Sequence, residues 1–176
     1  MKINYKITAW LFVVAIILLI VFYVFEFDYI GNTIGFESLI WKSLAAALIL
    51  GVYLGYRFQN KGEEQVDKIR IWSASLLFPL FFAPWLGSLT NRLIPRGQME
   101  NKVFEYVEER PFAASAYGFL QGEEIKEDGC YLFVFYNGKI RRLKRPTCQF
   151  FNKNNGDEII LPVRKGLWGH EIIPWK

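Results

Sequence analysis

The chain has 176 residues, of which 52% are hydrophobic, and a formal net charge of +4 at pH 7. A charge this small is weak support for a polyanionic partner, and the absence of repeats or low-complexity tracts excludes a solenoid and a disordered chain. Charged residues gather in the second half, since 14 of the 21 Lys and Arg and 11 of the 17 Asp and Glu lie from Arg92 onward. The composition therefore divides the chain into an apolar part and a polar part.

Three uncharged, strongly apolar segments fill the first half of the chain. A run of roughly 20 apolar residues matches a hydrocarbon core of about 30 Å at 1.5 Å rise per residue. The pattern predicts transmembrane helices over about 7–26, 38–57 and 71–91, within a membrane region of residues 1–94. The first helix is expected to be a retained anchor, because Glu26 to Asp28 follow it where small residues would mark signal cleavage.

The charges that flank the helices predict their orientation. The N-terminal tail and the connection between the second and third helices carry cations, whereas the connection between the first and second carries only acids. The residues are Lys2 and Lys6, then Arg57, Lys61, Lys68 and Arg70, and finally Glu26, Asp28 and Glu37. The positive-inside rule predicts a multi-pass inner (plasma) membrane protein with a cytoplasmic N-terminus and an extracytoplasmic C-terminal domain. Arg92, Arg96 and Lys102 weigh against this orientation.

The second helix carries a small residue at every fourth position: Ser43, Ala47, Gly51 and Gly55. Four-residue spacing lines these residues along one helix face, where two backbones can approach closely. The pattern predicts a helix-packing seam. Its partner is either another helix of the same chain or a second copy, and the sequence leaves both open.

In the third helix, Pro79 and Pro84 each remove a backbone donor and crowd the preceding turn, so a kink is expected. Broken helices can build transporter sites, but an ion-coupled carrier also needs ionisable groups at mid-membrane depth. The three apolar segments carry none there. A carrier is therefore disfavoured.

Residues 95–176 are expected to form a small β-rich extramembrane domain, either a sheet or a partial barrel, after a break at Pro95 to Gly97. The clearest element is a hairpin in which 130–136 and 139–145 flank the turn Asn137-Gly138. A two-residue turn places Leu132 opposite Leu143, Val134 opposite Arg141 and Phe135 opposite Ile140. Further extended segments are expected at 158–162 and 171–175.

The second hairpin strand is strongly basic and supports two interpretations. Its cations are Lys139, Arg141, Arg142, Lys144 and Arg145. They form either a surface for an anionic ligand or partner, or a charged edge that resists pairing with other chains. The acids Glu123, Glu124, Glu127 and Asp128 could neutralise part of this charge. Nucleic acid is not expected as a partner, because the domain is placed outside the cytoplasm.

The glycine-framed turn 166–169 presents Trp168, which either touches the membrane or a partner, or caps the domain's core. Cys130 and Cys148 are a candidate disulfide in an oxidising compartment. A strict hairpin register places Cys148 opposite Glu127, so the bond needs a bend near Pro146. A zinc site from these cysteines and His170 lacks close spacing and a fourth ligand.

His170 has no nucleophile motif or orienting carboxylate around it, and no phosphate-binding loop or paired-carboxylate signature is present. No enzyme, cofactor or metal is therefore expected. The preferred hypothesis is a sensing or interaction module in a homo- or hetero-oligomeric membrane complex, whose partners are the lipid bilayer and other membrane subunits or a second copy. The alternatives are a structural accessory subunit of a larger complex and a membrane effector of a defence or toxin-immunity system.

Overall fold

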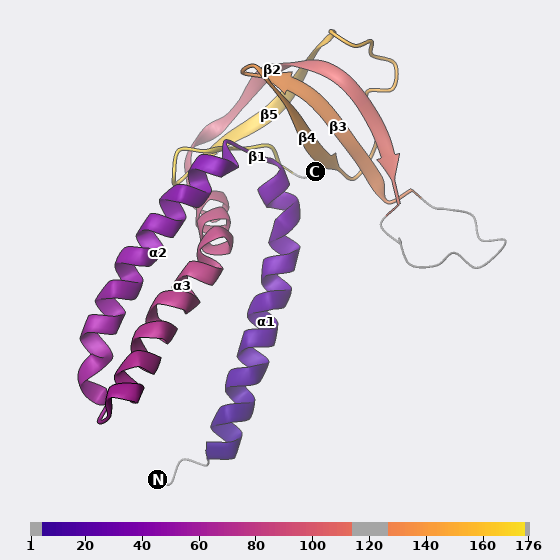
Figure 1. Ribbon diagram of the computed structural model, residues 1–176. Coiled ribbons are helices and arrows are strands. Elements are labelled where there is room, and N and C mark those ends of the chain that lie inside the picture. Colours follow the sequence, from indigo (N-terminus) through magenta and orange to yellow (C-terminus); the bar gives the residue numbers. More distant parts are fainter. Residues whose placement is uncertain (1–4, 114–126, 175–176) are drawn as a thin grey trace, which may run out of the picture. The chain divides into compact units, whose positions relative to one another are not determined.

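The computed structural model describes residues 5–113 and 127–174. The chain divides into two compact units, one of Met1–Phe27 with Glu37–Leu89 and one of Asp28–Phe36 with Thr90–Lys176. Helices dominate the first unit and β-strands the second (Figure 1). The short segment Asp28–Phe36 contains the end of the first helix, the connection after it and the start of the second helix, yet it belongs to the compact unit of the sheet.

The three predicted helices are confirmed as α1 (Tyr5–Gly31), α2 (Phe36–Phe58) and α3 (Gln65–Leu93). Each is long and apolar enough to cross a membrane, and a 3-10 turn, η1 (Gln59–Lys61), follows α2. The helices extend beyond the predicted spans at both ends. Hydropathy marks only the stretch suited to hydrocarbon, whereas helical hydrogen bonding continues into the polar interface.

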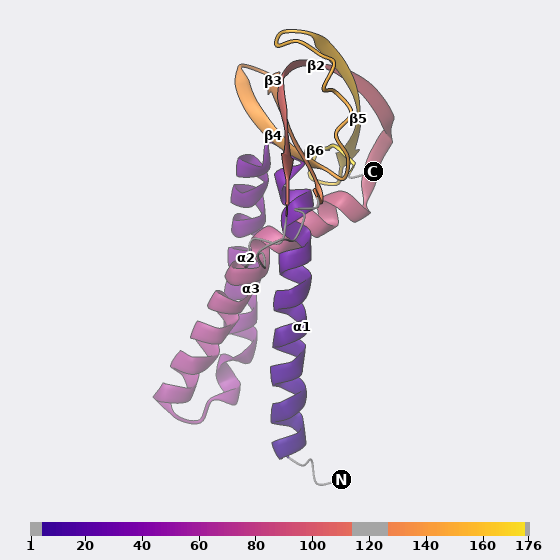
Figure 2. The ribbon, with the colours of Figure 1, turned by 90° about the vertical axis from the view of Figure 1, so that its right-hand side faces the viewer.

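Pro79 and Pro84 both lie inside α3, which remains helical through them. Figure 2 shows that α3 does not run straight. Proline is one of the few ordinary causes of a bent helix, because its ring crowds the preceding turn and its nitrogen cannot donate.

The second unit is built on one antiparallel sheet with the strand order β1-β6-β5-β2-β3-β4. The strands are β1 (Thr33–Ile34), β2 (Pro95–Phe112), β3 (Gly129–Tyr136), β4 (Lys139–Arg145), β5 (Glu158–Gly166) and β6 (Glu171–Ile172). The sheet curls into a half-barrel (Figures 1 and 2). The predicted β-rich domain is therefore confirmed, with the partial barrel as its form.

The predicted hairpin register is confirmed, because Leu132 pairs with Leu143 and Phe135 pairs with Ile140. Asn137 and Gly138 both have positive φ, at 51° and 76°, as the two-residue turn requires. One face of the curled sheet carries the apolar core, which consists of Phe104, Tyr106, Leu132, Val134, Leu143, Ile159, Leu161, Val163 and Ile173. We call this the concave face and the opposite one the convex face.

Candidate functional site

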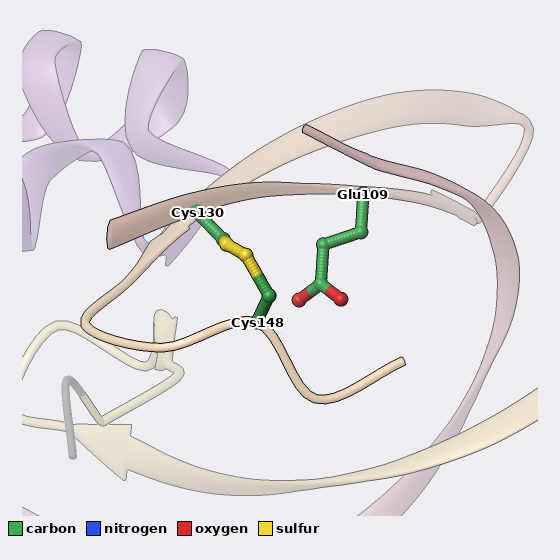
Figure 3. A group of neighbouring side chains, drawn as sticks. All are labelled: Glu109, Cys130 and Cys148. Carbon is green, nitrogen blue, oxygen red and sulfur yellow. A yellow bond between two sulfur atoms is a disulfide. The ribbon is translucent and has the colours of Figure 1, made fainter. Parts of the chain in front are cut away.

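A disulfide closes the corner that follows the hairpin. The structure joins Cys130 to Cys148, with their Cα atoms 5.3 Å apart (Figure 3). The hairpin ladder ends where Cys130 pairs with Arg145, and the chain bends at Pro146. Because of this bend, Cys148 no longer follows the register that would have placed it opposite Glu127. The chain thus makes the bend near Pro146 that a disulfide between Cys130 and Cys148 requires.

Glu109 of β2 completes this corner. Its carboxylate is 8% exposed and accepts hydrogen bonds from the backbone N–H groups of Gln149 and Phe150, at 3.1 and 2.8 Å. The carboxylate and the two sulfur atoms of Cys130 and Cys148 lie within 4.8 Å of one another. A metal ion would need thiolates, whereas these cysteines are oxidised and the carboxylate already accepts backbone donors. The cluster therefore acts as a clip that holds the segment after β4 to the sheet.

The charges around Glu109 are balanced inside the same corner. Arg145 is 9% exposed and donates to the side-chain oxygen of Gln149 at 3.3 Å. Burial lowers the pKa of Arg145, and the negative charge of Glu109 opposes that shift. Burial also raises the pKa of Tyr106, with Glu109 adding to the effect. Arg145 thus balances the charge of Glu109 inside the domain. Because it is buried, it does not belong to the anionic-ligand surface considered from the sequence.

The other cations of β4 have different surroundings. Lys144 pairs with Asp28 at 2.7 Å, and the guanidinium of Arg142 lies 4.9 Å from the ring centroid of Tyr131. Lys139 is exposed and Arg141 is half-buried. The strand lies at an edge of the sheet, which is the position assumed by the second of the two interpretations, and its cations have separate surroundings. Glu123 and Glu124, proposed to neutralise them, lie outside the described residues, as does Lys2 of the N-terminal tail.

Asn32 joins the two edges of the sheet. Its side-chain amide donates to the carbonyl oxygen of Lys144 at 2.9 Å and accepts from the N–H of Lys144 at 2.8 Å. Its own carbonyl accepts from the N–H of Ile173 at 3.0 Å. Asn32 precedes the edge strand β1, while Lys144 lies in the opposite edge strand β4. This 1% exposed amide therefore serves as an extra rung that closes the half-barrel.

Asn91, at the end of α3, holds the glycine-framed turn. Its side-chain amide donates to the carbonyl of His170 at 3.2 Å, and its side-chain oxygen accepts from the N–H of Trp168 at 3.0 Å. The indole N–H of Trp168 donates to the hydroxyl of Thr90 at 2.9 Å. Trp168 is half-buried, so the turn is anchored to the last turns of α3 and does not present a free tip.

His170 packs against the turn before α2. A Cβ added at Gly35 would lie 3.1 Å from the Nδ1 atom of His170, and Gly35 has a φ of +76° that glycine adopts without strain. Among the described residues, the only group of three side chains with metal-ligand spacing is Glu109 with the two cysteines, and His170 is not in it. The structure does not bring together the zinc set considered from the sequence.

The convex face carries an apolar patch on four neighbouring strands. Val103 pairs with Ile160 and Phe135 pairs with Ile140, while Glu105 lies opposite both Phe135 and Glu158. We call these six residues the convex patch: Val103, Glu105, Phe135, Ile140, Glu158 and Ile160. Its four apolar side chains are 52%, 40%, 63% and 63% exposed, for Val103, Phe135, Ile140 and Ile160. Glu105 and Glu158 are both exposed, and like charges directly opposite one another are destabilising.

In the helical unit, the predicted seam lies against α3. Ser43, Ala47, Gly51 and Gly55 are all buried in α2. A Cβ at Gly51 would lie 2.7 Å from the backbone oxygen of Ser75, and one at Gly55 would lie 2.6 Å from the ring of Trp72. The small residues thus let α2 and α3 of one chain approach closely, which is the intramolecular reading of the seam.

A buried carboxylate links α1 to α3. Glu26 is 3% exposed and accepts a hydrogen bond from the hydroxyl of Ser88 at 2.9 Å. The sequence placed Glu26 at the end of the first span, but α1 continues to Gly31, so this acid lies within the helix. Buried ionisable groups in membrane helices need such partners.

No protein-family model, no curated protein and no solved structure matches this chain.

Sequence reasoning missed Asn32, Asn91 and the convex patch. Asn32 reaches a partner 112 residues away, and no local pattern predicts such a contact. The convex patch did leave a signal, because 159–161 and 132–135 are apolar at successive positions. A strand with one solvated face normally alternates apolar and polar residues, so successive apolar residues indicate that both faces contact apolar surroundings.

Proposed function

We propose that this chain is a membrane-anchored interaction module whose half-barrel lies outside the cytoplasm and docks a protein partner on the convex patch. The observation that carries the proposal is the patch itself. Four exposed apolar side chains lie as two pairs on neighbouring strands of one sheet face, and exposed apolar patches on folded domains mark interaction sites.

Three features support the outward placement. The cations near the helix ends follow the positive-inside rule, and the disulfide fits an oxidising compartment. In addition, β1 lies between α1 and α2 in the chain but belongs to the same sheet as the strands that follow α3. The connection between α1 and α2 must therefore share a side of the membrane with the sheet, as it does when α2 and α3 each cross once.

Two of the three cations that weigh against this orientation, Arg92 and Lys102, have structural partners, which reduces their weight as orientation signals. The guanidinium of Arg92 lies 3.9 Å from the ring centroid of Tyr29, and Lys102 pairs with Glu171. Positive charges that have partners within the β unit are compatible with a domain on the outer side of the membrane.

The patch also defines the chemistry of its partner. Its apolar side chains require an apolar surface, and the opposed carboxylates Glu105 and Glu158 favour a cationic group that relieves their repulsion. The patch lies on the outside of a sheet and offers no nucleophile beside a base. Its role is therefore binding, and not catalysis.

Docking on the sheet can act on the helices, which gives the module a route for sensing. The end of α1, the start of α2 and the end of α3 all run directly into the β unit. A partner that shifts the sheet therefore acts on three covalent connections at once.

A photoactivatable amino acid at Ile160 tests this proposal in intact cells, with the same residue at the exposed Lys153 as the matched control. We expect a discrete crosslinked adduct from position 160 and none from position 153. The adduct should disappear when Glu105 and Glu158 are both changed to Lys. Equal adducts from both positions, or an adduct that survives the charge reversal, would refute docking on the convex patch.

A second candidate is a structural accessory subunit, which the poor burial of α1 favours. Only 6% of the most apolar stretch of α1 is buried, whereas 22% of the corresponding stretches of α2 and α3 is buried. A neighbouring helix could cover that surface. Purification in mild detergent separates the two roles, because an accessory subunit retains a stoichiometric neighbour after the convex patch is changed and a docking module does not.

A further inference from the structure

A polar cavity of about 260 Å³ opens where the apolar core of the concave face ends. Its walls come from the start of β2, the end of β5 and β6, and Val163 is its one core residue. The charged side chains that line it are Arg96, Glu100, Lys102, Lys165 and Glu171. The cavity shares no residue with the convex patch.

A bulge in β2 builds the cavity. The register of β2 shifts after Pro95, and residues 96–98 then lie opposite the single residue Lys165 of β5. A bulge interrupts strand alternation and re-aims side chains, and bulges often lie beside functional sites. The residues of this bulge, together with Lys165, form one side of the cavity.

The lining carries an excess of positive charge. Lys102 and Glu171 form an ion pair and neutralise each other, and the hydrogen bond to Glu171 raises the pKa of Lys102. Arg96 and Lys165 then face only one further carboxylate, that of Glu100. The side chains of both cations are exposed, so they can turn toward a bound anion.

The cavity begins close to the end of a membrane-length helix in the chain. Leu93 ends α3, and Arg96 follows three residues later, within about 10 Å at the rise of an extended chain. Leu93 and Ile94 are 62% and 49% exposed, as apolar residues at a membrane boundary are. Lipid phosphates lie just beyond the hydrocarbon core, in headgroup layers that together add about 10–15 Å to its thickness. If the hydrocarbon core ends near Leu93, this spacing places Arg96 at headgroup depth.

We propose that this cavity binds a phosphate group, with Arg96 and Lys165 as its ligands and Lys102 held in place by Glu171. Two sources share this chemistry, the headgroup of an anionic phospholipid and free inorganic phosphate. The depth of the cavity favours the lipid. Guanidinium and ammonium groups suit a phosphate, since each donates several charge-assisted hydrogen bonds.

Native mass spectrometry of the full chain in detergent tests the proposal. The probes are phosphatidylglycerol, phosphatidylcholine and inorganic phosphate. We expect wild type to retain phosphatidylglycerol in preference to phosphatidylcholine, and Lys165→Gln to weaken that binding about fivefold. Lys153→Gln removes the same charge from an exposed loop and should leave it unchanged. Glu100→Gln should tighten binding, a gain that a misfolded protein would not show.

The outcomes separate the two sources. If inorganic phosphate binds with the same variant pattern and phosphatidylglycerol does not, the site takes phosphate from solution. Equal losses for Lys165→Gln and Lys153→Gln would show that only net charge matters, and that result would overturn the site. Equal retention of the two lipids without phosphate binding would overturn it as well.

Discussion

The two faces of the half-barrel carry similar apolar residues that differ in how far they are exposed. On the concave face, Leu132 and Phe104 are 0% and 1% exposed and belong to the core. On the convex face, Ile140 and Ile160 are equally apolar but are both 63% exposed. Burial stabilises the first pair by removing apolar area from water, whereas the second pair remains largely in water and gains much less in the isolated chain. A patch of exposed apolar residues that contributes little stability favours a role in binding.

The largest expected effect comes from a substitution in the core of the concave face. Leu132→Ala should destabilise the β unit by about 2–5 kcal/mol, because a buried leucine loses its contacts and leaves a cavity. The matched control is Ile140→Ala, at an exposed position of the paired strand, which should cost about 0.5 kcal/mol or less. Denaturant unfolding of the full chain in detergent measures both. Equal losses would contradict the assignment of the two faces.

Removal of the disulfide should cost somewhat less. Its cysteines are separated by 18 residues, and in the chain-entropy model closing a loop of that size is worth about 3 kcal/mol. We expect the double change of Cys130 and Cys148 to Ser to lower stability by that order. The wild-type chain treated with a reductant should shift to the same unfolding midpoint. A variant as stable as oxidised wild type would mean that the hydrogen bonds accepted by Glu109 hold the corner alone.

Asn32→Ala tests the closure of the half-barrel. The change leaves the N–H and C=O of Lys144 without the side-chain amide that they contact, at a cost of about 1–3 kcal/mol for buried polar groups. Hydrogen exchange at the Lys144 amide should accelerate. Asn154→Ala, in an exposed turn, is the control and should leave that exchange rate unchanged. An unchanged rate in Asn32→Ala would show that the edge of β4 is protected in another way.

The convex patch should show the smallest effect on stability. Ile160→Ser should change the unfolding free energy by about 0.5 kcal/mol or less, yet it should abolish recovery of the partner. Glu105→Gln removes the repulsion from Glu158 and should stabilise the chain by a few tenths of a kcal/mol, roughly the scale of cross-strand pairs. A marked loss of stability in Ile160→Ser would indicate a structural patch.

Local patterns in the sequence predicted the three helices and the hairpin, because these elements depend on interactions between residues that are close in the chain. Hydropathy is sufficient for three helices, because the length of an apolar run decides whether it can cross a membrane. The Asn137-Gly138 turn is sufficient for the hairpin and its register, since two positive φ values allow one pairing. These features require no knowledge of distant residues.

The closure of the sheet and the candidate site could not be predicted in this way. The strand β1 has only two residues, and Asn32 contacts a strand that begins more than 100 positions later. The cavity near Arg96 depends on a register shift between β2 and β5, which no pattern within either strand encodes. Such features arise from the fit between elements, so they appear only once the elements are assembled.

Chemical labelling on intact cells tests the outward placement of the docking surface most directly. A membrane-impermeant maleimide is applied to Ile160→Cys and to Lys61→Cys, which lies in the connection between α2 and α3. The paired native cysteines leave wild type unlabelled. We expect Ile160→Cys to be labelled in intact cells and Lys61→Cys to be labelled only after the membrane is opened. The reverse pattern would place the half-barrel in the cytoplasm and contradict the proposed module.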